Sequence, residues 1–282
     1  GELKYYQFEE RCLEPIEELL FKADSQVVKS GLLRLYNAVL RSIPECTRRI
    51  SIKCILEHFN ITSELLREPL SELLAIYYSH GSVVDPILLD NSDAIQLVSD
   101  AVCSAMPRTT IDHVVGLLSS SITIYLKGLD SPNNIVRRAC EDSFMQTIGS
   151  LHGSIDSLYS VFTMLAHQIT VIESKRVQLR IANAMVTLNG RHLVFIEEKA
   201  RLSNETFINL LTLITSDEIR QVLLKGIIDY FIGRPSLMEC LAKKYQQSLL
   251  KRSQIDTEIL LAKALIDATD FRMFPWTPKL QS

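Results

Sequence analysis

The sequence predicts an all-α protein in which about six to seven pairs of helices stack into a superhelix. Its 282 residues include only 10 glycines and 9 prolines, which disfavours an all-β fold with many tight turns. A pattern also recurs: an acid–proline pair opens an apolar helix, a polar loop carries an aspartate, and a second amphipathic helix follows. The pattern begins at Glu14-Pro15, Glu68-Pro69 and Asp85-Pro86. Because each repeated pair buries its apolar face only against its neighbours, the pattern predicts a stacked array.

The first two expected pairs lie between residues 13 and 81. The apolar face of the first helix is Leu13, Ile16, Leu19 and Leu20, and that of the next, at residues 27–40, is Val28, Leu32, Leu35, Tyr36 and Val39. In the second pair, a short helix over residues 52–59 stops at Asn60. Thr62 or Ser63 then caps a longer helix, and His80-Gly81 ends it because glycine is common just past a helix end.

The third and fourth expected pairs are separated by Pro107-Arg108-Thr109. The third pair covers residues 83–106. In the fourth pair, Thr109 or Thr110 caps a helix that Gly128 ends. The partner of that helix covers residues 135–151, after a loop at Pro132.

The fifth pair is expected at residues 154–172 and 176–188, with Asn189-Gly190 as its stop signal. Residues 191–203 are either a helical turn or an irregular connection. The sixth pair covers residues 204–215 and 218–231, and two further helices cover residues 237–250 and 257–268. These helices form one domain, residues 1–270, and residues 271–282 form a tail whose prolines prevent a helix.

The segment Asp130-Ser131-Pro132-Asn133-Asn134-Ile135-Val136-Arg137-Arg138-Ala139 resembles the HEAT-repeat family. In that family, a loop aspartate precedes Val-Arg-x-x-Ala at the start of the second helix of a pair. Asp217-Glu218-Ile219-Arg220 carries the same acid and arginine, and the resemblance extends over roughly residues 10–232. It implies a HEAT-like α-solenoid in which the loop aspartate caps a helix and pairs with an arginine of a neighbouring unit.

Catalytic and metal-binding patterns are weak in this chain. It has no glycine-rich phosphate loop. Cys54 and His58 lie four residues apart with Cys46 nearby, but a complete zinc ligand set is missing, so packing and solvent contact explain them better. The serines at 119–121 share an apolar helix with His113 and lack the sharp turn that exposes a catalytic serine. We therefore expect no enzyme activity, no metal and no cofactor.

The cysteines and the apolar runs bear on location. Six dispersed cysteines with mostly apolar neighbours are typical of free thiols in a reducing compartment. The most apolar run, residues 113–126, is shorter than the about 20 residues that span a bilayer. We therefore expect an intracellular protein, cytoplasmic or nuclear, without membrane insertion. Since the chain starts at Gly1 without an initiator methionine, we also expect a piece of a longer protein.

The leading interpretation is a non-catalytic scaffold or adaptor that binds other protein subunits within a larger complex. Loops and edges carry the contacts of such proteins, and an aromatic tail anchors a partner well. The candidate partner-binding residues are Asp90, Asp93, Asn133, Lys175, Arg176, Phe274 and Trp276. The oligomeric state stays open.

Two alternatives use other surfaces. A scaffold of the chromosome or DNA-repair type would contact nucleic-acid phosphates through Lys243, Lys244, Lys251 and Arg252 in the basic C-terminal half. The net charge of −3 weighs against it. Tubulin binding, as in the TOG domains of the HEAT family, implies an aromatic residue in the first loop and basic residues in later loops. That loop is Lys22-Ala23-Asp24-Ser25-Gln26, and the third, Asp90-Asn91-Ser92-Asp93, is acidic, so this alternative is weaker.

Overall fold

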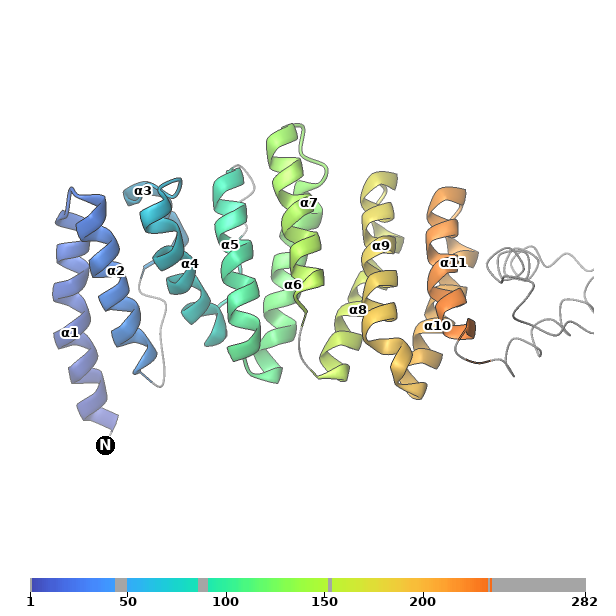
Figure 1. The fold of residues 1–282 in the computed structure, drawn as a ribbon, viewed down its shortest axis with the longest axis horizontal. Helices are drawn as coiled ribbons and strands as arrows, with labels where there is room; N and C mark the ends of the chain where they lie inside the picture. Colours follow the sequence, from blue (N-terminus) through green and yellow to red (C-terminus); the bar gives the residue numbers. More distant parts are fainter. Residues whose placement is uncertain (1, 44–49, 86–90, 152–153, 233, 235–282) are drawn as a thin grey trace, which may run out of the picture. The chain divides into compact units, whose positions relative to one another are not determined.

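The computed structural model describes residues 2–43, 50–85, 91–151, 154–232 and 234 (Figure 1). Over these ranges the chain forms helices and connecting loops without a β-strand, so the all-α prediction is confirmed. The α-helices are α1 (Glu2–Lys22), α2 (Gln26–Arg41), α3 (Ile52–His58), α4 (Glu64–Ser79), α5 (Ser92–Ala105), α6 (Ile111–Gly128), α7 (Asn134–Gly149), α8 (Ile155–Val171), α9 (Lys175–Arg191), α10 (Glu197–Leu213) and α11 (Asp217–Ile232). Two short 3-10 helices are η2 (Met106–Arg108) and η3 (Leu193–Phe195).

The chain divides into two compact units, residues 1–161 and 162–282, and the boundary falls within α8. In the first unit, α1 packs on α2, α2 on α4, α4 on α5, and α5 on α7 (Figure 1). α2 and α4 run parallel, because Ser30 and Asn37 bond to Leu65 and Pro69 in the same order along both helices. The core between these helices includes Leu33, Tyr36, Leu40, Leu70, Leu73, Tyr77, Val98 and Phe144.

Helix ends in the first unit follow local chemistry. The Ser51 hydroxyl caps α3 by accepting from the Cys54 amide at 3.1 Å. The Asn91 side chain caps α5, and the Asn133 side chain caps α7. Gly81 follows α4 with a φ of 91°, the left-handed conformation that favours glycine, which confirms the stop predicted at His80-Gly81.

In the second unit, α9 and α10 pack on α11 around Phe207. The Phe207 ring meets the Phe162 ring edge to face, with centroids 5.3 Å apart. A Cβ atom on Gly226 would lie 2.5 Å from the Phe207 ring, so the absence of a side chain is what lets α11 approach α10 here. Asn189 is 1% exposed, donates from Nδ2 to the Gly226 carbonyl at 3.4 Å, and accepts from the Ser203 hydroxyl at 2.7 Å.

Two predictions about helix boundaries are wrong. Asn189-Gly190 does not stop a helix, because α9 continues to Arg191 while the Asn189 side chain bonds to α10 and α11. α10 begins at Glu197, seven residues before the start predicted at Asn204, so most of the uncertain stretch 191–203 is helical.

The expected place of the prolines is also corrected. Pro15 lies inside α1 and Pro69 inside α4, so the acid–proline pairs do not open these helices. Ser63, one of the two positions predicted for the cap, precedes α4 instead. Its side chain makes no capping hydrogen bond, because its hydroxyl donates to the Gln26 side chain at 2.7 Å. Pro86, the aromatic tail at 271–282 and the helices expected at 237–250 and 257–268 lie outside the described residues.

The predicted apolar face of α2 is wrong in part, because the buried side of the helix is rotated away from Val28 and Leu35. Val28 and Leu35 were expected in the core but are 52% and 50% exposed. Tyr36, which belongs to the predicted face, is buried as expected. The helix also buries Leu33, Leu40, Ser30 and Asn37, which were not predicted to face the core. On α1, Leu13 and Leu20 are buried as expected, whereas Leu19 is 56% exposed.

Candidate interaction surface

Ion pairs join α2 to α4 on the surface of the first unit. Arg34 lies 2.5 Å from Glu68, and Arg41 lies 2.6 Å from Glu72. Arg108 of η2 reaches the same Glu72 oxygen at 2.7 Å, so one carboxylate serves two guanidinium groups. These contacts fix side chains from three elements on one continuous surface.

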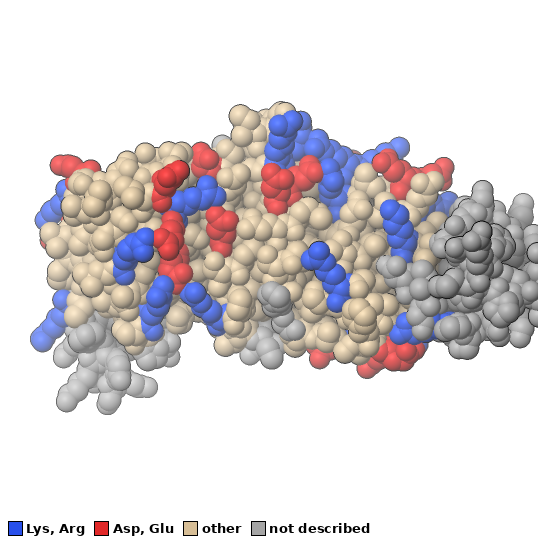
Figure 2. All heavy atoms as spheres, viewed as in Figure 1, with Lys and Arg blue, Asp and Glu red and all other residues tan. Residues whose placement is uncertain are grey.

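Similar contacts continue to α5 and α7. Arg67 of α4 pairs with Asp100 of α5 at 3.0 Å. The Gln146 amide of α7 donates to the other Asp100 oxygen at 3.3 Å, and its own oxygen accepts from the buried Ser99 hydroxyl at 3.1 Å. We call Arg34, Arg41, Arg67, Glu68, Glu72, Asp100 and Arg108 the ion-pair belt. Figure 2 shows neighbouring blue and red side chains over this part of the molecule.

Glu72 is the most enclosed carboxylate of the belt, with its side chain 20% exposed. Burial alone raises the pKa of this carboxyl group. The hydrogen bonds and positive charges of Arg108 and Arg41 outweigh burial, so the net pKa of Glu72 is lowered. The belt therefore keeps Glu72 charged at neutral pH, and its net charge is positive because four arginines face three carboxylates.

A shallow pocket lies between α2 and α4 beside the belt. Arg34, Arg41, Glu68 and Glu72 line it together with Asn37 and Pro69. Asn37 is 3% exposed and donates from Nδ2 to the Pro69 carbonyl at 2.8 Å. The buried Asn37 amide therefore joins α2 to α4 beneath the charged residues that line the pocket.

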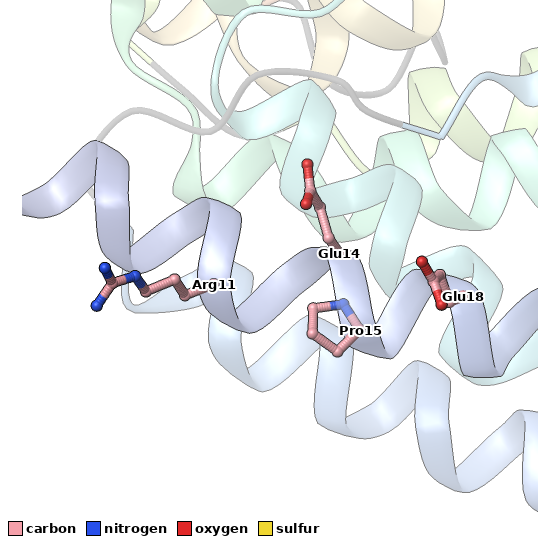
Figure 3. Close-up of a pocket in the computed structure, with 4 residues that line it drawn as sticks. All are labelled: Arg11, Glu14, Pro15 and Glu18. Carbon is pink, nitrogen blue, oxygen red and sulfur yellow. The ribbon is translucent and has the colours of Figure 1, made fainter.

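A second, open pocket lies on α1 and is lined by Arg11, Glu14, Pro15 and Glu18 (Figure 3). Glu14 and Glu18 are one turn apart, and Glu18 pairs with Lys22 at 3.3 Å. Because these side chains lie on one exposed helix, the pocket does not enclose a ligand.

The residues predicted to contact partners are spread over several elements. The Asn133 side chain accepts from the Ile135 amide at 3.0 Å, so it holds the start of α7. Asp93 lies in the first turn of α5, where the Asn91 side chain accepts from the Asp93 amide at 3.0 Å. Lys175 and Arg176 form the exposed first turn of α9 in the second unit. Asp93 and Asn133 thus belong to the first unit, and Lys175 and Arg176 belong to the second.

The remaining candidates fall in parts of the chain that the structure does not describe. They are Asp90, Phe274 and Trp276 for partner contact, and Lys243, Lys244, Lys251 and Arg252 for nucleic acid. Both sets of candidates stay predictions.

The residues of the weak metal-binding and catalytic patterns, Cys54 with His58 and the serines at 119–121, make contacts within their own helices. The Cys54 Sγ and His58 Nδ1 atoms are 3.8 Å apart, and burial, followed by the charge of Glu57, raises the pKa of the Cys54 thiol. Ser120 and Ser121 donate to carbonyls of their own helix. Among the described residues, no three His, Cys, Asp or Glu side chains lie close enough to hold a metal ion.

The chain was compared with family models, curated proteins and solved structures, and none of them matches. Within the described ranges, no helix combines the length and the apolar character needed to cross a bilayer. The fold and the surface thus define a class only: an all-α protein of side-by-side packed helices with a belt of exposed ion pairs.

Sequence reasoning missed the ion-pair belt. Arg34 and Arg41 are seven residues apart, and Glu68 and Glu72 are four apart, so each pair lies on one helix face. That spacing is a usable signal, but it does not say which helices become neighbours.

Proposed function

We propose that the chain is a non-catalytic interaction module, a HEAT-type α-solenoid that binds other protein subunits within a larger intracellular assembly. The observation that carries this proposal is the row α2, α4, α5 and α7, in which each helix packs on the next. A solenoid is expected to have such rows, because each repeat contacts only its neighbours.

The ion-pair belt supports the same function. It links α2, α4 and α5 of this row on the surface, and its arginines keep more than 40% of their side chains exposed. Exposed ion pairs contribute only about 0–1 kcal/mol each to stability. A network that adds little stability but fixes charged groups in place is well suited to orient a charged partner.

The proposal is tested by affinity purification of the full chain from its source cells, with quantitative mass spectrometry. We expect subunits that co-purify in stoichiometric amounts and that are reduced by the double substitution Arg34→Gln and Arg41→Gln. Arg201→Gln is the matched control, because it removes an exposed arginine whose described ion pair, with Glu205, lies within α10. Absence of any stoichiometric partner, or turnover of a substrate that a point substitution abolishes, would contradict the proposal.

A further inference from the structure

The outward face of α2 is apolar along its length. Val27, Val28 and Leu35 are 68%, 52% and 50% exposed. Gly31 and Ala38 are also exposed, and Leu32 and Val39 are half-buried between them and the core. The charged residues of this helix, Lys29, Arg34 and Arg41, lie at other positions around it. We call Val27, Val28, Gly31, Leu35 and Ala38 the outer face of α2.

This face is additional to the one that holds the helix in the fold. Leu33, Tyr36 and Leu40 already bury the inner side of α2. A helix at a protein surface normally has a polar outer side, so a second apolar side indicates a contact with another molecule.

Gly31 stands in the middle of the outer face. A Cβ atom at this position would meet no heavy atom within 4 Å, so packing within the chain does not require glycine. Glycine in a helix interior is less stable than alanine. Small residues on one face, here Gly31 with Ala38 two turns away, allow the backbone of another helix to approach closely.

The edge of the outer face that borders α4 is positive. Arg34 and Arg41 lie along it with side chains 60% and 57% exposed. Arg41 and Arg108 both pair with the Glu72 carboxylate. Two positive charges therefore share one negative charge, and this group of three residues has a net charge of +1 within the belt. In Figure 2 the surface over α1 and α2 is mostly tan next to the blue and red belt.

We propose that the outer face of α2 binds an amphipathic helix of a partner protein. The apolar side of that helix covers Val28, Gly31 and Leu35, and carboxylates along its edge pair with Arg34 and Arg41. This inference rests on the proposed function as an interaction module, and it names the surface and the chemistry of the partner. Helix-on-helix docking of this kind uses apolar anchors at i, i+3, i+4 and i+7.

Charge argues against an antiparallel second copy of this chain as the occupant. An antiparallel copy of α2, related by a two-fold axis, would bring the two arginine edges together on the same side of the interface. Like charges held side by side disfavour that pairing. An acidic partner helix has no such repulsion.

The first experiment identifies what contacts the face. A photo-crosslinking amino acid replaces Leu35 in the full chain, and the crosslinked peptide is sequenced from source cells by mass spectrometry. We expect a peptide with apolar residues at helical spacing and Asp or Glu beside them. The control places the same probe at Ile135, an exposed position on α7. A crosslink from position 35 to a second copy of this chain or to lipid would overturn the proposal, and so would capture of only those peptides that the control also captures.

The second experiment measures binding of the purified crosslinked protein to the full chain. Gly31→Arg should weaken binding by about tenfold or more, since a central interface position is blocked. Ile135→Arg, the matched exposed control, should leave binding within about twofold. Arg41→Glu should weaken binding. Replacing the Asp or Glu of the partner peptide that faces Arg41 with Lys should restore binding to this variant.

The two proposals fail in different ways. If a partner binds normally to the folded Gly31→Arg variant, the chain remains an interaction module and the α2 surface is the wrong one. If no protein partner exists, the proposed function itself fails.

Discussion

The Ser30 hydroxyl of α2 donates a 2.8 Å hydrogen bond to the Leu65 carbonyl of α4. In a regular helix this carbonyl would accept from the amide of residue 69, but residue 69 is proline and has no N–H. Ser30 therefore replaces the donor that Pro69 removes. The neighbouring Asn37 donates to the Pro69 carbonyl at 2.8 Å, so two buried polar side chains of α2 fix its register on α4.

The first prediction concerns Ser30 and Pro69. Ser30→Ala should lower the free energy of unfolding by about 1 kcal/mol, because the Leu65 carbonyl loses its donor. In a Pro69→Ala background the same substitution should cost less, since the alanine that replaces Pro69 supplies an amide to that carbonyl. Urea denaturation of the four proteins in this double-mutant cycle measures the difference. Equal costs of Ser30→Ala in both backgrounds would show that the two residues act independently.

The same contacts explain why the orientation of α2 could not be predicted from the sequence. The helical period fits a face of Val28, Leu32, Leu35, Tyr36 and Val39, of which only Tyr36 is fully buried. It fits the buried residues equally well, so the local pattern gives two overlapping candidate faces. The buried face includes Ser30 and Asn37, and a pattern of apolar residues does not predict that polar side chains are buried. Their hydrogen-bond partners, the carbonyls of Leu65 and Pro69, lie more than 30 residues away.

Asn189 shows the same limit in the second unit. Asn-Gly is a common turn signal, but here Asn189 bonds to Ser203 and Gly226 from within a helix. Helix existence and the glycine stop at Gly81 depend on neighbours in sequence, and these predictions are confirmed. The cap of α7 is Asn133 and not the loop aspartate Asp130 that the resemblance implied. The ion-pair belt depends on which helices pack together, and the local pattern does not contain that information.

The second prediction concerns the pH dependence that Glu72 causes. Its pKa is lowered in the folded protein, so it contributes stability above the unfolded-state pKa of about 4.3, and this is lost as the pH falls through the folded value. Glu72→Gln should reduce the free energy of unfolding at neutral pH by about 1 kcal/mol. The difference from wild type should shrink below about pH 4.3. Thermal unfolding over this pH range measures it, with Glu205→Gln in α10 as an exposed control; a pH-independent difference would contradict the prediction.

The third prediction compares the substitution of two buried tyrosines by phenylalanine, which removes one hydroxyl group in each case. The Tyr36 hydroxyl donates to Glu17 at 2.6 Å. The buried Tyr125 hydroxyl lies near the Ser99 and Thr147 side chains but makes no hydrogen bond of standard geometry in the described structure. Tyr36→Phe should therefore cost about 1–2 kcal/mol in the free energy of unfolding. Tyr125→Phe should be neutral within about 0.5 kcal/mol or stabilising, because it removes an unsatisfied buried group. Similar losses in chemical denaturation would contradict the assigned contacts.

The fourth prediction contrasts Gly226 with Gly116, which both lie inside helices. Gly226→Ala places a Cβ atom 2.5 Å from the Phe207 ring, so α11 or the ring has to move. We expect a loss of about 1–3 kcal/mol in the free energy of unfolding, as for other overpacked cores. At Gly116 a Cβ atom meets nothing within 4 Å, so Gly116→Ala should stabilise α6 by about 0.5–1 kcal/mol.

Urea denaturation of both variants measures these opposite signs. Phe207→Leu combined with Gly226→Ala completes the test, because the smaller side chain should relieve the clash with the Phe207 ring. The alanine at position 226 should then cost less than it does in the wild-type protein. If Gly226→Ala is stabilising on its own, the close approach of α11 to Phe207 is not what requires glycine at this position.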